Sequence, residues 1–178
     1  MGGSGSGYRH SKKTTVEDCL TLDINKLVRD GLIQPDIVLH GGTLTWTNTA
    51  TGEKVSTAGF WVSTHMDSDR YFRLVYSIKS SGEDVDYRIP VETTRPHYGG
   101  LRWWFICPLS RNGQYCGRRV SKLHLPPGGK YYGCRHCYDL TYQSCQESHK
   151  YDRMFAELAA GMPGMNAAEV KEMFKQDL

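Results

Sequence analysis

The sequence predicts an α+β fold in which a small antiparallel β region precedes a cysteine-rich ribbon, with helical segments at both ends. Three observations lead to this prediction. Apolar and polar residues alternate with period two from about residue 36 to 106, with turn residues between the runs. Four cysteines in two close pairs follow within residues 107–137. Apolar residues at helical spacing lie before and after these parts.

Composition limits the classes of protein that this chain can be. Its 178 residues suffice for one ordinary domain or two small ones. Hydrophobic residues make up 39% of the chain, and no apolar run is long enough to cross a membrane. Residues 1–14 contain no apolar core of a secretory signal. We therefore expect a cytoplasmic protein without a membrane partner.

The prediction divides the chain into four parts: residues 1–14, 15–98, 99–142 and 143–178. The first is a flexible Gly/Ser and basic arm with too little apolar surface to offset the entropy of ordering. Two interpretations of this arm stay open at this point. It is either a cloning linker or a native arm that becomes ordered on a polyanion.

The second part begins with a predicted helix between Thr15 and Asp30. Its apolar face carries Leu20, Ile24, Leu27 and Val28, and either Thr15 or Asp23 would cap it. Gly31 is expected to end the helix. Strands are then predicted over residues 43–47, 55–62, 71–78 and 85–91, with turns at residues 51–54 and 80–83.

In the third part, strands are predicted over residues 102–106, 118–125 and 130–133, with a turn at Pro126–Gly129. A cysteine pair follows the first strand, and the second pair follows the last. In the fourth part, helices are predicted from Tyr151 to Ala159 and after Asn166. Asn166 would cap the second helix together with Glu169.

The four cysteines have the spacing of a metal site. Cys134 and Cys137 form a C-x-x-C pair, and 17 residues separate them from the wider pair Cys107 and Cys116. In a reducing compartment such spacing favours zinc over disulfides. Four thiolates leave no open coordination position, so we expect one structural Zn²⁺ in a zinc ribbon.

The other candidate ligands are assigned no metal role. Cys19 and Cys145 are expected to be ordinary thiols. His136 lies inside the second pair and is expected to face solvent or nucleic acid. His149 follows Cys145 by four residues, and the pair is a weak candidate for a second metal site.

The cysteine segment, residues 102–138, is strongly basic. It carries seven Arg and Lys residues and no Asp or Glu, whereas the rest of the chain carries 15 basic and 19 acidic residues. Aromatic residues interleave with these cations, a combination typical of nucleic-acid binding. Two other interpretations remain open: the charge could offset the zinc–thiolate centre, and the aromatic rings could form the core of the ribbon. The predicted binding residues are Arg102, Trp104, Arg118, Arg119, Lys122, Lys130, Tyr131, Tyr132 and Arg135.

Catalytic signals are weak. Ser, His and Asp are present in no recognisable nucleophile arrangement, and neither a P-loop nor a dinucleotide fingerprint occurs. The carboxylates at residues 67–69 and 83–86 lie in or beside predicted turns, where solvated charges are ordinary. We therefore expect that the protein is not an enzyme and has no catalytic residues.

Several sequence blocks resemble a widespread, largely uncharacterised family of small bacterial zinc-ribbon proteins that are common near mobile elements. The blocks are M-G-G-x-G-S-G at residues 1–7, V-E-D-C-L-x-L-D at 16–23, R-W-W-F-x-C-P at 102–108, C-G-R-R-V at 116–120 and C-R-H-C-Y at 134–138. The resemblance covers most of residues 1–153. It implies that the Gly-rich start is native and that the four cysteines bind the metal, and it supplies no established activity. Family members tend to end in an Arg-rich helix, which residues 154–178 lack.

Two hypotheses for function follow. In the first, a structural-zinc protein binds DNA or RNA through the basic, aromatic-rich face of its ribbon. In the second, the chain is a protein-binding module or inhibitor from a phage or mobile element that docks on a host nucleoprotein complex, for example in counter-defence. An enzyme is a third and weaker hypothesis.

Overall fold

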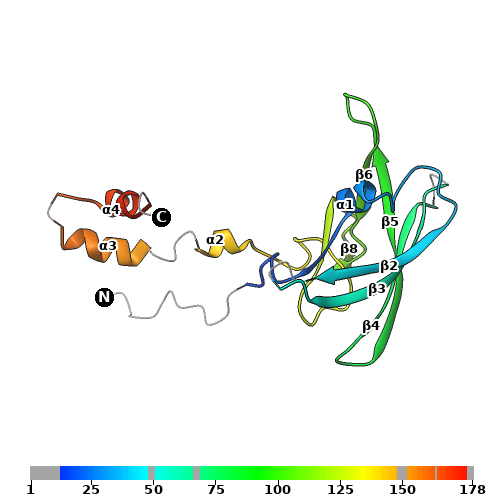
Figure 1. Cartoon of the computed structure of the whole chain (residues 1–178), viewed down its shortest axis with the longest axis horizontal. Helices are drawn as coiled ribbons and strands as arrows, with labels where there is room; N and C mark the ends of the chain where they lie inside the picture. The colour runs from blue at the N-terminus through cyan, green and yellow to red at the C-terminus, as the bar shows by residue number, and fades with distance from the viewer. Residues whose placement is uncertain (1–12, 48–50, 66–68, 148–151, 163, 176–178) are drawn as a thin grey trace. The chain divides into compact units, whose positions relative to one another are not determined.

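The computed structural model describes residues 13–47, 51–65, 69–147, 152–162 and 164–175. The described residues form two compact units, one ending at Leu140 and one beginning at Thr141. The chain is mixed α and β, and a curled sheet in the first unit dominates it (Figure 1). The predicted arm lies outside the described residues except for positions 13 and 14.

The sheet has six strands in the order β2-β3-β4-β5-β6-β9, and each neighbouring pair is antiparallel. The predicted alternation runs correctly identified the four strands from β2 to β5. The bounds are β2 (His40–Thr47), β3 (Lys54–Ser63), β4 (Tyr71–Ile78), β5 (Glu83–Thr94), β6 (Arg102–Ile106) and β9 (Arg119–Val120).

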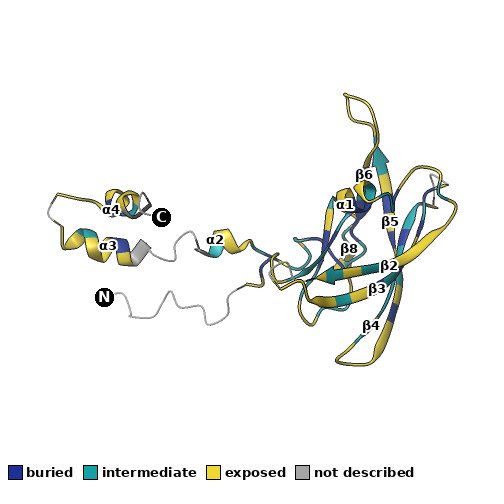
Figure 2. Cartoon of the chain, in the orientation of Figure 1, coloured by how far each residue is buried: buried dark blue, intermediate teal, exposed yellow. Residues whose placement is uncertain are grey.

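Period-two alternation places the core on one side of this sheet. Phe60, Phe72 and Phe105 come from three different strands and are each no more than 2% exposed. Phe60 stacks on Phe72 with ring centroids 5.3 Å apart, and Phe72 meets the edge of Phe105 at 6.0 Å. Figure 2 shows buried and exposed residues alternating along these strands. The opposite side, which we call the outer face, carries Trp61 and Arg88.

The N-terminal segment corrects the first helix prediction. Residues Leu20–Asp23 form a strand, β1, which pairs with β10 (Lys122–Leu125), and the helix α1 spans only Ile24–Arg29. Asp23 caps α1, because its carboxylate accepts the Asn25 N–H at 2.9 Å. Gly31, with φ of 75°, follows the helix. The apolar spacing was correct for α1, but pairing with β10 converts the preceding turn into a strand.

The cysteine segment is not a separate helix-flanked ribbon, which corrects the fold prediction. β6 and β9 extend the large sheet, whereas β10 leaves that sheet and pairs with β1. Thus the single strand predicted over residues 118–125 is divided between two sheets. A short hairpin joins β7 (Ser110–Arg111) to β8 (Gln114–Tyr115), and residues 130–133 form only one bridge, from Gly133 to His124.

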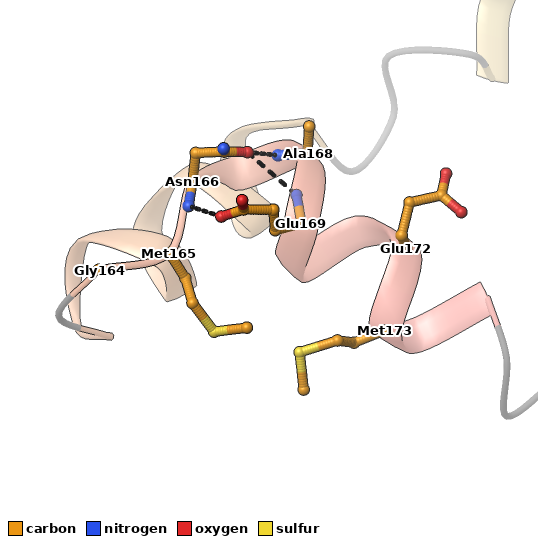
Figure 3. A pocket seen from close by; sticks show the side chains of 7 residues that line it. All are labelled: Gly164, Met165, Asn166, Ala168, Glu169, Glu172 and Met173. Carbon is orange, nitrogen blue, oxygen red and sulfur yellow. Dashed lines mark hydrogen bonds between the residues drawn. The ribbon is translucent and has the colours of Figure 1, made fainter.

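The second unit is helical, with α2 (Gln143–Glu147), α3 (Asp152–Ala160) and α4 (Ala167–Lys175). The predicted capping box is present at α4 (Figure 3). The Asn166 side chain accepts the N–H groups of Ala168 and Glu169 at 3.0 Å, and the Glu169 carboxylate accepts the Asn166 N–H at 2.8 Å. Within the described residues, no helix is both long and apolar enough to cross a bilayer.

Candidate metal centre

The four predicted cysteines converge on one point in the first unit. The Sγ atoms of Cys107 and Cys137 lie 3.7 Å apart, those of Cys116 and Cys134 lie 3.8 Å apart, and all four fall within 4.8 Å of one another. A tetrahedral site with Zn–S bonds of about 2.3 Å requires sulfur–sulfur separations of about 3.8 Å. Disulfides require about 2.05 Å. The four cysteines are therefore free thiols placed so that they could bind a metal ion.

The first pair is fixed by the backbone between β6 and β9. Cys107 follows the end of β6, and its N–H donates to the Arg118 carbonyl at 2.9 Å. The Cys116 N–H donates to the Leu109 carbonyl at 2.9 Å, which closes the β7–β8 hairpin. Gly117, with φ of 56°, reverses the chain directly after Cys116 in a conformation that favours glycine. The two sulfurs therefore point from one loop into the same space.

The second pair lies on a helical turn that two hydrogen bonds hold. The Cys137 N–H donates to the Cys134 carbonyl at 3.0 Å, and the Leu140 N–H donates to the Arg135 carbonyl at 3.0 Å. Gly133 lets this turn approach the first loop, because a Cβ there would lie 2.1 Å from Cδ1 of Leu109. A residue without a side chain is thus required where the two loops meet.

The sulfurs differ in their surroundings. Burial raises the pKa of the Cys107 thiol to about 11, although the N–H groups of Leu109 and Cys134 donate to its sulfur and oppose this shift. Burial also raises the pKa of Cys137. Burial acts in the same direction on Cys116, but the Arg118 N–H and the neighbouring thiols outweigh it and lower that pKa. A metal ion must therefore displace protons from Cys107 and Cys137, so its affinity rises with pH.

Tyr132 was predicted to stack on a base, and the structure corrects this. The side chain is 1% exposed, and its ring stacks on Trp46 at 5.9 Å and meets the edge of Tyr76 at 6.2 Å. Its N–H also donates to the Tyr87 hydroxyl at 2.8 Å. Trp46 and Tyr76 come from β2 and β4, so Tyr132 packs the second cysteine loop against the large sheet.

Three predicted phosphate-binding cations have carboxylate partners from other parts of the chain. Arg119 pairs with Glu92 at 2.7 Å, Lys122 with Asp23 at 3.4 Å, and Lys130 with Glu83 at 2.5 Å. These carboxylates belong to β5 and β1, outside the cysteine segment. The acid-free charge of residues 102–138 is therefore partly neutralised once the chain folds.

The other predicted binding residues keep more exposure. Arg102 is exposed, and its guanidinium lies 4.1 Å from the ring centroid of Trp104, whose Nε1 donates to the Thr94 hydroxyl at 2.9 Å. Tyr131 is 37% exposed, and Arg135 is half-buried. The structure does not gather the predicted set onto one surface, since Tyr132 faces the core.

A basic hollow beside the cysteines was not singled out from the sequence. It has a volume of about 340 Å³, and Arg111, Arg118 and His136 line it together with Cys116 and Cys137. Arg111 donates to the His136 carbonyl at 3.2 Å. The exposed Arg118 side chain has no hydrogen-bond or ion-pair partner within the described residues. Arg111 could have been found from its place in the basic segment, but its approach to His136 depends on the folded loops.

The other candidate ligands were expected to have no part in this site. Cys19 donates from Sγ to the Thr15 carbonyl at 3.2 Å, and burial raises its pKa to about 11. Cys145 is exposed on α2, and His149 lies outside the described residues. Among the residues that the structure describes, Cys107, Cys116, Cys134 and Cys137 form the one such cluster found.

Comparisons with protein-family models, with curated proteins and with solved structures found no match to this chain. The resemblance to a bacterial zinc-ribbon family therefore stays a prediction from the sequence blocks.

Proposed function

We propose that this chain is a structural-zinc protein that binds nucleic acid. The observation that carries the proposal is the basic hollow beside the four cysteines, where the Arg118 side chain has no partner within the described residues, Arg111 comes from the same cysteine loop, and His136 comes from the second one. Two guanidinium groups and an imidazole can donate hydrogen bonds to the oxygens of a phosphate. The proposed role is binding, because four protein sulfurs leave the metal no coordination position for a reacting water.

Zinc is the metal that we propose for the centre. Thiolate ligands in a tetrahedral set select Zn²⁺ or an iron–sulfur centre, and backbone N–H groups donate to Cys107 and Cys116, as zinc–thiolate loops require. Bound zinc would fix the loop that carries Arg118 against the turn that carries His136. It would thereby hold the two sides of the hollow at a constant separation.

The competing interpretation is that Arg111 and Arg118 only balance the metal centre. Four thiolates and Zn²⁺ carry a formal charge of about −2, which two neighbouring cations would offset. The two interpretations predict different effects of Arg118→Ala. If Arg118 binds phosphate, nucleic-acid affinity falls and zinc affinity is unchanged. If Arg118 balances the centre, zinc affinity falls.

The test measures both affinities on the zinc-loaded full chain. Fluorescence anisotropy with labelled DNA and RNA, single-stranded and duplex, is recorded over a range of salt concentrations. We expect affinity to fall steeply with salt and Arg118→Ala to reduce the slope by about 0.7–0.9. Arg29→Ala, which removes an exposed arginine from α1, is the matched control. Absence of binding to every oligonucleotide at low salt would contradict the proposal.

A second candidate function, docking on another protein, is favoured by the second unit. Met165 and Met173 line a hollow at the start of α4, and their side chains extend to the same side of the helix (Figure 3). They are 37% and 50% exposed. Exposed methionines are adaptable contacts for a protein partner. A host protein that co-purifies with the chain and is lost from Met165→Gln/Met173→Gln would support this function.

A further inference from the structure

The outer face of the large sheet carries aromatic rings beside arginines, whereas the solvent side of an antiparallel sheet is ordinarily polar. Trp61, Tyr71, Arg73 and Arg88 lie on β3, β4 and β5, between residues that point to the core. The register places Trp61 beside Arg73, and Arg73 beside Arg88. A row of side chains therefore crosses three strands on one face.

Trp61 lies flat at one end of this row. It is 38% exposed, and a Cβ on Gly41 of the neighbouring strand would lie only 2.9 Å from its Cδ1 and Nε1 atoms. A Cβ on Gly59 would lie 3.7 Å from the indole Cζ3 atom. The indole thus rests on two glycines, one on β2 and one on β3. The two glycines therefore allow the ring to lie close to the backbone, and part of the side chain stays exposed.

Three guanidinium groups lie over rings on the same face. Arg73 lies 5.4 Å from the Trp61 centroid and Arg88 lies 4.2 Å from the Tyr71 centroid. On β6, Arg102 covers Trp104 at 4.1 Å. Planar guanidinium groups supported by rings are themselves surfaces on which nucleobases stack.

Some arginines of the outer face form ion pairs with carboxylates, and others do not. Arg73 is neutralised by a bidentate pair with Asp86, and Arg119 pairs with Glu92 at 2.7 Å. Within the described residues, Arg88 and Arg102 form no ion pair, although Arg88 acts together with Arg73 in lowering the pKa of Asp86. The uncompensated charge beside the rings is therefore positive, which complements a phosphate backbone.

The chemistry of the face favours nucleic acid over protein. A protein interface is usually anchored by side chains that become fully buried, and the aliphatic residues Leu74, Ile89 and Val91 on these strands face the core instead. On the outer face, the residues beside the rings are Arg73, Val75, Asp86 and Pro90, of which only Val75 and Pro90 are apolar. Duplexes keep their bases stacked inside, so only a single strand can offer base faces to such a row.

We propose that the outer face of β3–β6 binds a single strand of DNA or RNA, with bases stacked on Trp61 and on the guanidinium planes of Arg88 and Arg102. This inference rests on the proposed nucleic-acid function and specifies the ligand and the surface. Arg102 and Trp104, which the sequence already predicted as binding residues, form one end of this surface. The basic hollow at Arg118 would then contact phosphates.

The test uses the zinc-loaded full chain and labelled oligothymidine, oligouridine and a duplex. We expect the single strands to bind more tightly than the duplex. Trp61→Ala should weaken binding about tenfold or more, because it removes a stacking ring. Arg88→Ala/Arg102→Ala should lower the slope of log affinity against log salt by about 1.4. Thermal unfolding of each variant separates loss of binding from loss of folding.

Gly41→Ala provides a sharper test because it keeps the Trp61 indole and changes only the position of the ring. The added Cβ displaces the ring from its position over the glycine backbone, so single-strand affinity should fall as it does for Trp61→Ala. Gly161→Ala, where the added Cβ meets its nearest atom at an ordinary contact distance of 3.5 Å, is the control. If Gly41→Ala and Trp61→Ala both bind as the unchanged chain does, the inference is wrong.

Outcomes distinguish this inference from the function on which it rests. If no oligonucleotide binds, the proposed function fails and this inference fails with it. If a duplex binds as tightly as a single strand and Trp61→Ala has no effect, the proposed function stands and this inference fails. If a co-purifying protein is lost from Trp61→Ala while oligonucleotides never bind, the face belongs to a protein partner and the inference is overturned.

Discussion

The large sheet and the loops that carry the four cysteines are stabilised by different means. In the sheet, Phe60, Phe72 and Phe105 pack ring against ring across strands, and regular pairing joins six strands. The second cysteine loop has one isolated bridge at Gly133 and the helical turn that begins at Cys134. We therefore expect the sheet to form from apolar burial, whereas the cysteine loops should depend on their contacts with the sheet and on a metal ion that the four sulfurs could bind.

Removing a metal ligand should produce the largest difference in stability between the two regions. Cys134→Ser should abolish zinc binding and the associated folding free energy, which is about 10–16 kcal/mol for structural zinc in small modules. Hydrogen exchange should then show loss of protection over residues 107–140, with β3, β4 and β5 still protected. Cys145→Ser, at an exposed position outside the cluster, is the control. Equal protection in the unchanged chain and Cys134→Ser would refute the contrast.

A core substitution in the sheet should affect both regions. Phe72→Ala removes a ring that is fully buried between Phe60 and Phe105, at a cost of about 3–5 kcal/mol in unfolding free energy. Since β6 carries Phe105 and leads into Cys107, the cysteine loops should unfold in the same transition. Denaturant unfolding of the zinc-loaded protein measures this. Tyr98→Ala, at a position 98% exposed, should change stability little. Separate transitions for the two regions would show that the sheet does not support the loops.

The contact between the two cysteine loops should show a smaller effect. Gly133→Ala places a Cβ 2.1 Å from Cδ1 of Leu109 and 2.9 Å from Cε2 of Tyr138, so these side chains must shift or the loops must move apart, at a cost of about 1–3 kcal/mol. Zinc affinity, measured by competition with a chelator, should fall accordingly. Leu109→Ala in the same chain should recover part of the loss. Gly161→Ala, where the nearest atom lies at 3.5 Å, should leave zinc affinity unchanged. An unaltered affinity in Gly133→Ala would mean that the loops tolerate separation.

The strands and the metal centre could be predicted from the sequence because their signals are local. Alternation identified the strands β2 to β5, and cysteine spacing identified four sulfurs that meet. Partners distant in the sequence could not be predicted in this way. Period two shows that residues 118–125 are extended, but it does not show that β9 pairs with β6 and β10 with β1. Apolar spacing alone likewise did not distinguish β1 from the first turn of a helix.

The orientation and ion pairs of the predicted binding side chains also depend on partners distant in the sequence. Tyr132 follows Tyr131 in the sequence, yet it faces the core because Trp46 and Tyr76 arrive from the sheet. Counting charge along residues 102–138 likewise missed Glu83 and Glu92, which the fold brings beside Lys130 and Arg119. A local charge count therefore overstated the free positive charge of the cysteine segment.

The ion pair between Arg119 and Glu92 joins the cysteine segment to β5, and it should have the smallest effect on stability. Both side chains are about half exposed, at 60% and 47%, so removing either should change the unfolding free energy by about 0.2–1 kcal/mol. Binding should respond differently. Glu92→Gln keeps the shape of the side chain but releases Arg119, so affinity for oligonucleotides at low salt should rise rather than fall.

The double variant Glu92→Gln/Arg119→Ala determines whether the released arginine causes this gain. If Arg119 contacts phosphate once it is free, the gain disappears in the double variant and the salt slope returns to that of the unchanged chain. If the gain persists, it comes from removing a negative charge near Trp104, which faces Glu92 in the register. If neither variant changes affinity, β9 does not contact the bound nucleic acid. The binding surface would then be confined to the outer face from β3 to β6 and the hollow at Arg118.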